Sequence, residues 1–199
     1  MAWLKAHGRH AITQKQLYDA LTRGRPLPPH PVLITFDDGY RNVLENAAPV
    51  LARLHMPATA YMITERISGP DPSFLTWRML RALERGGVEV GSHTVTHRDL
   101  TSLSDAQALA ELVKSKRTLE RRLGHRVPWL AYPFGGEDPR IVAFARRAGY
   151  ALAVTTHSGS DHTRTTCSDS TGTQSSTRPA SPASPRSCAE LDENKLVLG

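Results

Sequence analysis

The sequence predicts an α/β fold built on a parallel sheet, either curled into a barrel or open and doubly wound. Apolar strand-like segments alternate about five times with amphipathic helical segments, as expected for successive βα units. The first strand-like segment, 32–36 (VLITF), is apolar throughout, which is typical of a strand buried on both faces of a parallel sheet. We therefore expect functional side chains where the strands end, because the loops there converge on one face.

The helices are indicated by apolar residues at helical spacing, together with start and stop signals. In chain order they are expected over 13–23, 43–54, 76–85, 104–123 and 139–148. The first and fourth open with capping boxes, Thr13 with Gln16 and Ser104 with Gln107. Pro49 lies inside the second helical pattern, where it either kinks the helix or marks its true first turn.

The strands are indicated by short apolar runs bounded by proline or glycine. They are expected over 32–36, 58–63, 88–90, 127–132 and 150–156. A proline-rich connector, 26–31, leads into the first strand, Pro57 introduces the second, and Gly86 and Gly87 precede the third. This order of strands and helices leaves both a barrel and a doubly wound sheet open.

Length and composition limit the classes of protein to consider. The 199 residues suit one domain, or a domain with a tail. No apolar run reaches membrane-spanning length, and no signal peptide is visible at the start. The net charge of +6 is spread without a dense basic block, which favours a solvated basic surface over nucleic-acid binding. Cys167 and Cys188 are the two cysteines, so neither a disulfide framework nor a cysteine zinc site is indicated.

The character of the chain changes after the last predicted strand. Residues 158–188 are dominated by Ser, Thr, Pro and Arg, and contain no Leu, Ile, Val, Phe, Tyr, Trp or Met. Such a segment cannot bury enough apolar surface to offset its ordering entropy. We predict one folded domain over 1–157 and a disordered tail over 158–199. Because another βα unit is due here, we hypothesise a shifted reading frame or a degenerate end, and a barrel short of its last strands.

Two adjacent carboxylates follow the first buried strand, at Asp37 and Asp38, and Gly39 comes next. Charges at the mouth of a buried strand repel each other and lose solvent, so they need a cation, a shared proton or a basic partner. The alternative is that the three residues form an ordinary polar turn.

His93 and His97 follow the third strand, at a spacing that would place both imidazoles on one side of a helical turn. Two such imidazoles can share one metal. With nine histidines in the chain, surface or hydrogen-bonded histidines are the alternative. Joined to the acid pair, the histidines predict a site with two imidazoles and one carboxylate on a metal, while the other carboxylate acts as a general base.

Four segments together resemble a known family. They are TFDDG at 35–39, SHTVTH at 92–97, YPFG at 132–135 and AGY at 148–150. The combination resembles the NodB-homology polysaccharide deacetylases, carbohydrate esterase family 4, over residues 17–156. The resemblance implies a distorted (β/α) barrel, incomplete here at its C-terminal end, with a groove for a sugar polymer across the strand ends. It implies removal of acetyl groups from N-acetylglucosamine units of an extracellular or cell-envelope polysaccharide.

The same resemblance implies roles for individual residues. Asp37 would be the catalytic base, and Asp38, His93 and His97 would hold a divalent metal, usually zinc. The backbone N–H of Phe134 would face the oxyanion, with Tyr132 beside it at the substrate. Simple packing at the strand end is the alternative for both aromatic residues.

Two departures from the family pattern bear on activity. Ala131 occupies a position where many members have arginine. The resulting Ala-Tyr-Pro-Phe-Gly motif at 131–135 is similar to that of the branch acting on poly-N-acetylglucosamine. Family members also supply a late histidine as general acid, and no Leu-x-His motif appears near the end of this chain. His157 or His162 would have to substitute, unless both are exposed loop histidines.

Three functions therefore stay open. The first is a metal-dependent polysaccharide N-deacetylase, and the second is a catalytically impaired relative that binds metal or glycan without turnover. The third is an unrelated α/β metal hydrolase such as a phosphoesterase. The two histidines favour zinc over Mg²⁺, which counts against the third function.

Overall fold

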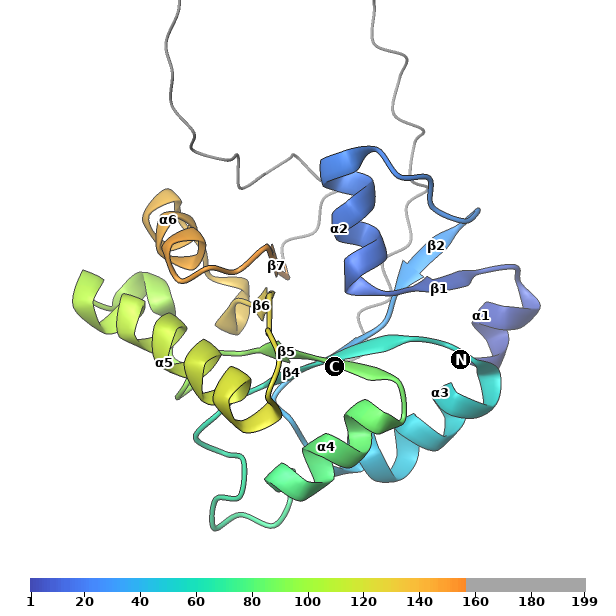
Figure 1. Cartoon of the computed structure of the whole chain (residues 1–199), viewed down its shortest axis with the longest axis horizontal. Helices are drawn as coiled ribbons and strands as arrows, with labels where there is room; N and C mark the ends of the chain where they lie inside the picture. The colour runs from blue at the N-terminus through green and yellow to red at the C-terminus, as the bar shows by residue number, and fades with distance from the viewer. Residues whose placement is uncertain (157–199) are drawn as a thin grey trace, which may run out of the picture.

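The computed structural model describes residues 1–156, and the predicted tail over 158–199, with both cysteines, lies outside the described part. A five-stranded parallel sheet forms the centre of the molecule (Figure 1). Its strands are β3 (Thr35–Phe36), β4 (Ala58–Met62), β5 (Val88–Ser92), β6 (Trp129–Ala131) and β7 (Leu152–Val154). The α-helices are α1 (Ala2–Ala6), α2 (Gln14–Arg23), α3 (Ala48–Leu54), α4 (Trp77–Arg85), α5 (Asp105–Leu123) and α6 (Pro139–Arg147).

The order of the strands decides between a barrel and a doubly wound sheet. A doubly wound sheet reverses its strand order at a switch point. In the described part of the chain, the order β3-β4-β5-β6-β7 follows the sequence without reversal, and each neighbouring pair is parallel. Figure 1 shows the sheet curled, with α3, α4, α5 and α6 around its outside and α2 on the other side. The predicted distorted barrel is thus confirmed as a half-barrel.

The opening apolar stretch forms two strands where the sequence predicts one. β2 (Pro31–Leu33) pairs in parallel with β1 (His10–Ile12) in a separate two-stranded sheet, whereas β3 pairs with β4. The chain changes partner at Ile34, whose carbonyl accepts a hydrogen bond from the Thr59 N–H at 2.9 Å. Apolar composition indicates that a segment is buried, but it carries no information about which strand lies beside it.

The second predicted helix begins with a π-helical turn, η1 (Val43–Ala47), and continues as α3. Pro49 is the second residue of α3, directly after the π-helical turn, and Ala47 and Ala48 before it are themselves helical. Of the two roles left open for Pro49, the structure favours the one inside the helix, because Pro49 lies at the junction between the π-helical turn and α3 and not at the helix start. The elements α1 and β1 were not predicted, because five and three residues are too few to show a periodic pattern.

Both predicted capping boxes are present. Thr13 N–H donates to the Gln16 side chain at 2.8 Å, and Ser104 N–H donates to the Gln107 side chain at 3.2 Å. Gly24, at the end of α2, has the left-handed φ of 64° that favours glycine. None of the helices within residues 1–156 combines the length and apolar character needed to cross a membrane.

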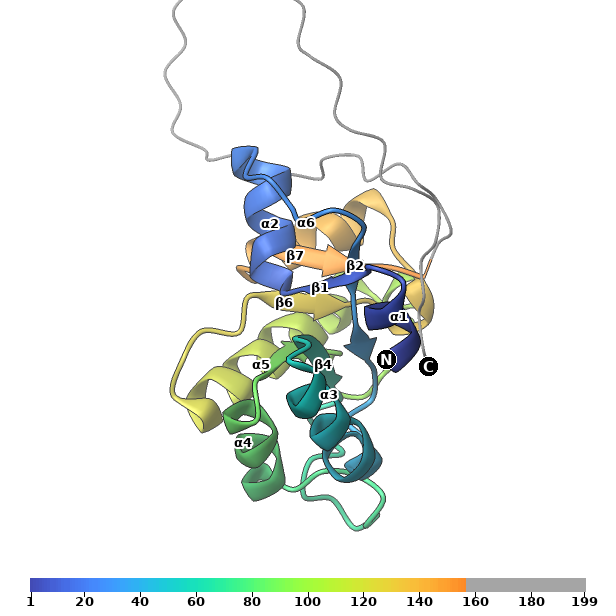
Figure 2. The ribbon, with the colours of Figure 1, turned by 90° about the vertical axis from the view of Figure 1, so that its right-hand side faces the viewer.

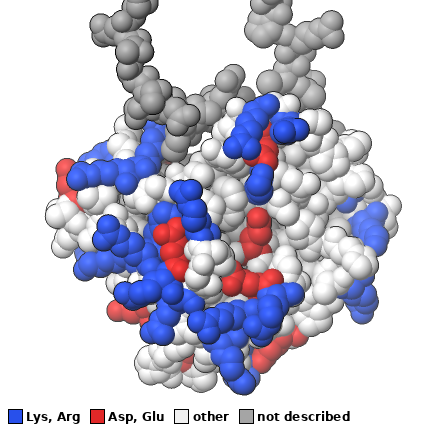
Figure 3. All heavy atoms as spheres, in the orientation of Figure 1, with Lys and Arg blue, Asp and Glu red and all other residues white. Residues whose placement is uncertain are grey.

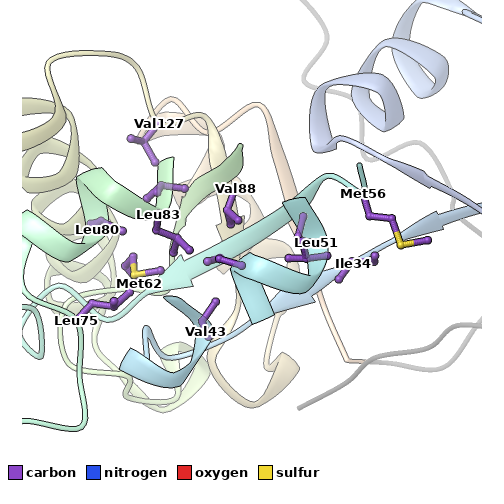
Figure 4. Close-up of a cluster of buried hydrophobic side chains, with 14 of the residues drawn as sticks. Ile34, Val43, Leu51, Met56, Met62, Leu75, Leu80, Leu83, Val88 and Val127 are labelled. Atoms are coloured by element: carbon purple, nitrogen blue, oxygen red, sulfur yellow. The ribbon is translucent and has the colours of Figure 1, made fainter. Parts of the chain in front are cut away.

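Alternate residues of the sheet pack on its two faces, one toward the surrounding helices and one toward the inside of the half-barrel. From β4, Ala58, Ala60 and Met62 belong to a cluster that packs against the surrounding helices (Figure 4). That cluster also contains Leu51 of α3 and Leu80 and Leu83 of α4. Because successive strand residues point to opposite faces, Thr59 and Tyr61 point to the inside of the half-barrel.

The inside of the half-barrel is filled by aromatic rings. Tyr61 is fully buried and clusters with Trp129 of β6, and Tyr18 of α2 approaches Trp129 with ring centroids 6.1 Å apart. Figure 2 shows α2 beside β6 and β7. Gly91 of β5 makes room for this packing, since a Cβ on Gly91 would lie 2.3 Å from Tyr61 Cδ1.

Gly91→Ala should therefore destabilise the protein by about 1–3 kcal/mol, the usual cost of overpacking a core. The control is Gly86→Ala, because Gly86 has an ordinary φ of −78° and its added Cβ would approach no nearer than 3.2 Å. Urea unfolding curves of both variants measure the difference. Equal stability of Gly91→Ala and wild type would show that Tyr61 does not fill this space.

Candidate metal centre

The side chains of the predicted site come from loops at one edge of the sheet. Asp37 and Asp38 follow β3, His93 follows β5, and the short helix η3 (Pro133–Gly135) follows β6. Carboxyl ends of parallel strands share one edge of a sheet, which brings groups distant in sequence together. The structure thus unites the acid pair and the histidine pair that the sequence singles out.

Three donor atoms converge at this edge. Asp38 Oδ1 lies 3.7 Å from His93 Nε2 and 3.6 Å from His97 Nε2, and the two imidazole nitrogens are 3.1 Å apart. The three residues meet the geometric requirement for holding a metal ion between them. Tetrahedral ligands at zinc distances lie about 3.3 Å from one another. The three observed distances fall on both sides of that value and within a few tenths of an ångström of it, so the donor set fits a metal with small shifts of the side chains.

The tautomer of His93 is fixed by its surroundings. His93 Nδ1 lies 2.8 Å from the carbonyl oxygen of Ala131, and a carbonyl can only accept, so Nδ1 carries the proton. The lone pair is then on Nε2, which is the atom aimed at Asp38 and His97. A histidine ligand with its other nitrogen bound in this way is the usual arrangement around a metal.

The loop that carries the two histidines is not helical, and the predicted helical turn is wrong. Thr94 and His97 have left-handed φ values of 68° and 60°, and His97 N–H donates to Thr94 Oγ1 at 3.1 Å. The imidazoles meet because the chain turns sharply after β5. Four-residue spacing alone does not distinguish such a turn from a helix.

His97 is held in its neutral form. Burial lowers the pKa of His97 first, and the neighbouring His93 lowers it further, against the opposing carboxylates of Asp38 and Asp37. A neutral imidazole is the form that binds metal ions. The local environment of His97 is therefore suited to a ligand.

The acid pair lies in a tight turn with left-handed backbone, a conformation that few residue types adopt. Asp38 has a left-handed φ of 69° and Gly39 one of 83°, and Gly39 N–H donates to the Asp37 carbonyl at 2.9 Å. A Cβ at Gly39 would lie 2.8 Å from Met62 Sδ. The glycine is thus needed both for its backbone conformation and for the close approach of β4.

The Asp37 carboxyl is perturbed by its partly buried position. Burial raises the pKa of Asp37, the charge of Asp38 raises it further, and His93 and His97 oppose the shift. A carboxyl group in this state needs a positive charge beside it to stay ionised. An ionised acid pair beside His97 in its neutral form carries an excess of negative charge, which a divalent cation would balance.

The two aromatic residues of the third predicted motif lie in different environments. Phe134 is 69% exposed and has a left-handed φ of 57°, and its ring meets the His97 ring at a centroid distance of 4.7 Å. Tyr132 is buried in the cluster of Leu130 and Ile141, outside the half-barrel. The side chain of Tyr132 is therefore core, as the packing alternative expected, while Phe134 borders the site.

The turn at Phe134 is held by the two residues that follow β7 (Leu152–Val154). Thr155 Oγ1 donates to the Gly135 carbonyl at 2.8 Å, and a Cβ on Gly135 would collide with Thr156 Oγ1 at 2.1 Å. His157, the candidate substitute acid, lies just outside the described residues.

On the face seen in Figure 3, Lys and Arg side chains are interspersed with Asp and Glu side chains.

Sequence reasoning missed the carbonyl of Ala131 as the partner of His93. In the sequence, Ala131 is notable as the residue in place of arginine, whereas in the structure it contributes a backbone oxygen that binds His93 Nδ1. Every residue carries such an oxygen, so composition and spacing hold no signal for this contact.

Comparison with known proteins identifies the family. Residues 24–153 match the Polysaccharide deacetylase family, and the chain belongs to that family. It is 31% identical over 159 residues to YxkH of Bacillus subtilis, covering 80% of this chain and 56% of YxkH. It is 30% identical over 148 residues to the poly-beta-1,6-N-acetyl-D-glucosamine N-deacetylase of Staphylococcus epidermidis, covering 67% of this chain and 50% of the relative. The chain thus spans about half the length of these relatives.

A solved structure shares the fold. The Streptococcus pyogenes deacetylase PplD, determined in complex with acetate, superposes with a TM-score of 0.74 at 28% identity. The match covers 78% of this chain and 69% of PplD. IcaB of Ammonifex degensii, at 24% identity and a TM-score of 0.70, has the same fold.

The raised pKa of Asp37 predicts how metal-free stability depends on pH. A carboxyl whose pKa rises on folding supports the folded state best below its unfolded pKa, and this contribution is lost as the pH rises through the folded pKa. Asparagine carries no charge to desolvate. With chelator present, the melting temperature of Asp37→Asn relative to wild type should rise as the pH rises above about 4, where an unfolded aspartate ionises.

Asp71→Asn is the control of opposite sign. Hydrogen bonds from Ser73 lower the pKa of Asp71, so its contribution is present above the ordinary pKa and lost in acid. The relative melting temperature of Asp71→Asn should therefore fall as the pH rises. A pH-independent difference for Asp37→Asn would contradict the assigned desolvation of Asp37.

Proposed function

We propose that this chain is the catalytic domain of a metal-dependent polysaccharide N-deacetylase, acting on N-acetylglucosamine units. The observation that carries the proposal is the convergence of Asp38, His93 and His97 beside a second, partly buried carboxylate, Asp37. Membership of the polysaccharide deacetylase family supports it. Zinc is the proposed metal, because two imidazoles and one carboxylate suit zinc better than Mg²⁺.

The proposed substrate class rests on the relatives. The Staphylococcus epidermidis relative is a deacetylase of poly-beta-1,6-N-acetyl-D-glucosamine, and the PplD structure is a complex with acetate. We extend that chemistry to this chain as the proposal. An extracellular or cell-envelope location follows from such a substrate and is part of the same proposal.

The residues divide the chemistry between them. Asp38, His93 and His97 would hold the metal, which supplies a Lewis acid for an acetamide carbonyl and lowers the pKa of a water. Asp37 accepts the proton of the attacking water as general base. The water oxygen bonds to the carbonyl carbon, the C–N bond then breaks, and the products are acetate and a free amine.

Phe134 is proposed to contribute through its backbone. Its N–H lies in the turn that borders His97, and it would donate to the carbonyl oxygen as that oxygen gains charge. The exposed Phe134 ring would at the same time cover one side of the bound acetyl group. The leaving amine needs a proton, and His157 is retained as the candidate donor.

A second function stays as the alternative because the late Leu-x-His motif is missing from the sequence. In that case the chain would bind metal or glycan without turnover. Zinc binding without acetate release would identify this alternative, and hydrolysis of phosphate esters alone would identify a metal phosphoesterase.

The test measures acetate release from β-1,6-linked N-acetylglucosamine oligomers, with added zinc and with chelator. We expect chelator-sensitive release in the wild type. Asp37→Asn should lose about 10²–10⁴-fold in rate, the usual contribution of a general base, while keeping bound zinc. His93→Ala should lose both zinc and activity.

His7→Ala is the matched control, because His7 is an exposed histidine stacked on Trp3 and should leave zinc and activity unchanged. Full activity in Asp37→Asn, or chelator-resistant acetate release, would contradict the proposal.

A further inference from the structure

The loop between the two histidines has backbone groups that no strand satisfies. β5 ends at Ser92, so the N–H groups of Val95 and Thr96 lie beyond the sheet. Partly buried N–H groups of this kind need an acceptor from elsewhere in the fold.

One side chain supplies that acceptor. Glu111 Oε2 accepts from Val95 N–H at 2.8 Å and from Thr96 N–H at 2.9 Å, and Glu111 Oε1 accepts from the Thr96 hydroxyl at 2.8 Å. Both carboxylate oxygens are thus used on the same two residues. Charge-assisted hydrogen bonds of this number are among the stronger restraints a side chain can place on a loop.

Glu111 is mounted on a rigid element. Its neighbour Leu112 is fully buried, and the Leu112 carbonyl accepts from the Tyr150 hydroxyl at 3.0 Å. One turn further along α5, Ser115 Oγ lies 2.7 Å from Ser92 Oγ at the end of β5. The distance between α5 and the strand that carries His93 is therefore fixed.

The opposite side of the loop is held by backbone groups. Thr64 N–H donates to the Thr94 carbonyl at 3.1 Å, and Glu65 N–H donates to the Val95 carbonyl at 3.0 Å. The loop is thereby clamped on both sides, and Glu111 is the side-chain half of the clamp. Left-handed backbone at non-glycine residues, here Thr94 and His97, persists only where the surroundings hold it.

From this geometry we propose that Glu111 is the positioning residue of the metal site, holding the 94–96 loop so that His97 Nε2 meets His93 and Asp38. The role rests on the proposed function, because it assumes a metal at these three residues. It acts chiefly on His97, since His93 is fixed separately by β5 and by the Ala131 carbonyl. Removal of Glu111 would leave a site with two well-placed ligands and one misplaced one.

Zinc affinity measured by competition with a chromophoric chelator, well below the melting temperature, tests this role. Glu111→Ala should weaken zinc binding about 10–100-fold, the usual effect of removing a partner that orients a ligand. Glu111→Gln should bind within about threefold of wild type, since its carbonyl oxygen can accept both backbone N–H groups and its amide can donate to Thr96 Oγ1. Thr96→Val, which loses one of the three hydrogen bonds, should lie between them.

Glu120→Ala is the matched control on the same helix. Glu120 also accepts a backbone N–H, that of Val127 at 3.0 Å, and pairs with Lys116, but it serves the segment before β6. Glu120→Ala should lower the melting temperature and leave zinc affinity unchanged. This control separates a positioning role of Glu111 from a general effect of stability.

Several outcomes would overturn the proposal. Wild-type zinc affinity in Glu111→Ala would show that Glu111 does not position the site. Equal weakening of zinc binding in Glu111→Gln and Glu111→Ala would show that the charge of Glu111, not its positioning of the loop, matters. Equal weakening in Glu120→Ala would reduce the effect to stability. If wild-type protein binds no zinc, or binds it equally after His93→Ala, the proposed function itself fails and the role of Glu111 fails with it.

Discussion

The carboxylates of Asp37 and Asp38 lie at the end of β3, where the chain leaves the core and water is partly excluded. Burial raises the pKa of Asp37, and the neighbouring Asp38 adds to the shift. Two negative charges so placed need compensation. His93 and His97 place ring nitrogens within 4 Å of Asp38, and a divalent cation between the three would balance the charge of both acids. The surrounding fold holds Asp38, His93 and His97 close enough together for one cation to contact all three.

Several parts of the fold serve this arrangement. Sequential parallel strands bring the loops after β3 and β5 to one edge of the half-barrel, although β4 lies between them. Gly39 permits the close approach of the acid turn to Met62, and Gly91 permits Tyr61 to fill the interior beneath the site. The Ala131 carbonyl then fixes the tautomer of His93. Packing inside and outside the sheet thus sets the geometry of a few polar atoms at its rim.

Much of the architecture could be predicted from the sequence. Strand–helix alternation, capping boxes and terminal glycines carry local signals, and they predicted the parallel sheet and most helices. The acid and histidine pairs were recognisable because reactive residue types followed predicted strands. The resemblance to polysaccharide deacetylases came from the four segments taken together.

The rest depends on contacts that the sequence does not encode locally. The change of partner at Ile34 depends on which strands lie alongside β2 and β3. The turn between His93 and His97 requires left-handed backbone at Thr94 and His97, neither of which is glycine. Glutamate is a common residue on the exposed face of a helix, so Glu111 is not conspicuous in the sequence. Only the folded chain shows that its carboxylate binds the loop at Val95 and Thr96. Tyr132 directly follows β6 and joins the outer cluster of Leu130, and this placement depends on which face of the sheet the end of the strand presents.

The most direct test of the account is the position of zinc in crystals of the zinc-loaded protein, located by anomalous diffraction at the zinc absorption edge. The account predicts one strong peak at about 2.0–2.2 Å from a carboxylate oxygen of Asp38 and from Nε2 of both His93 and His97. A strong peak at other residues, with this triad empty, would contradict it.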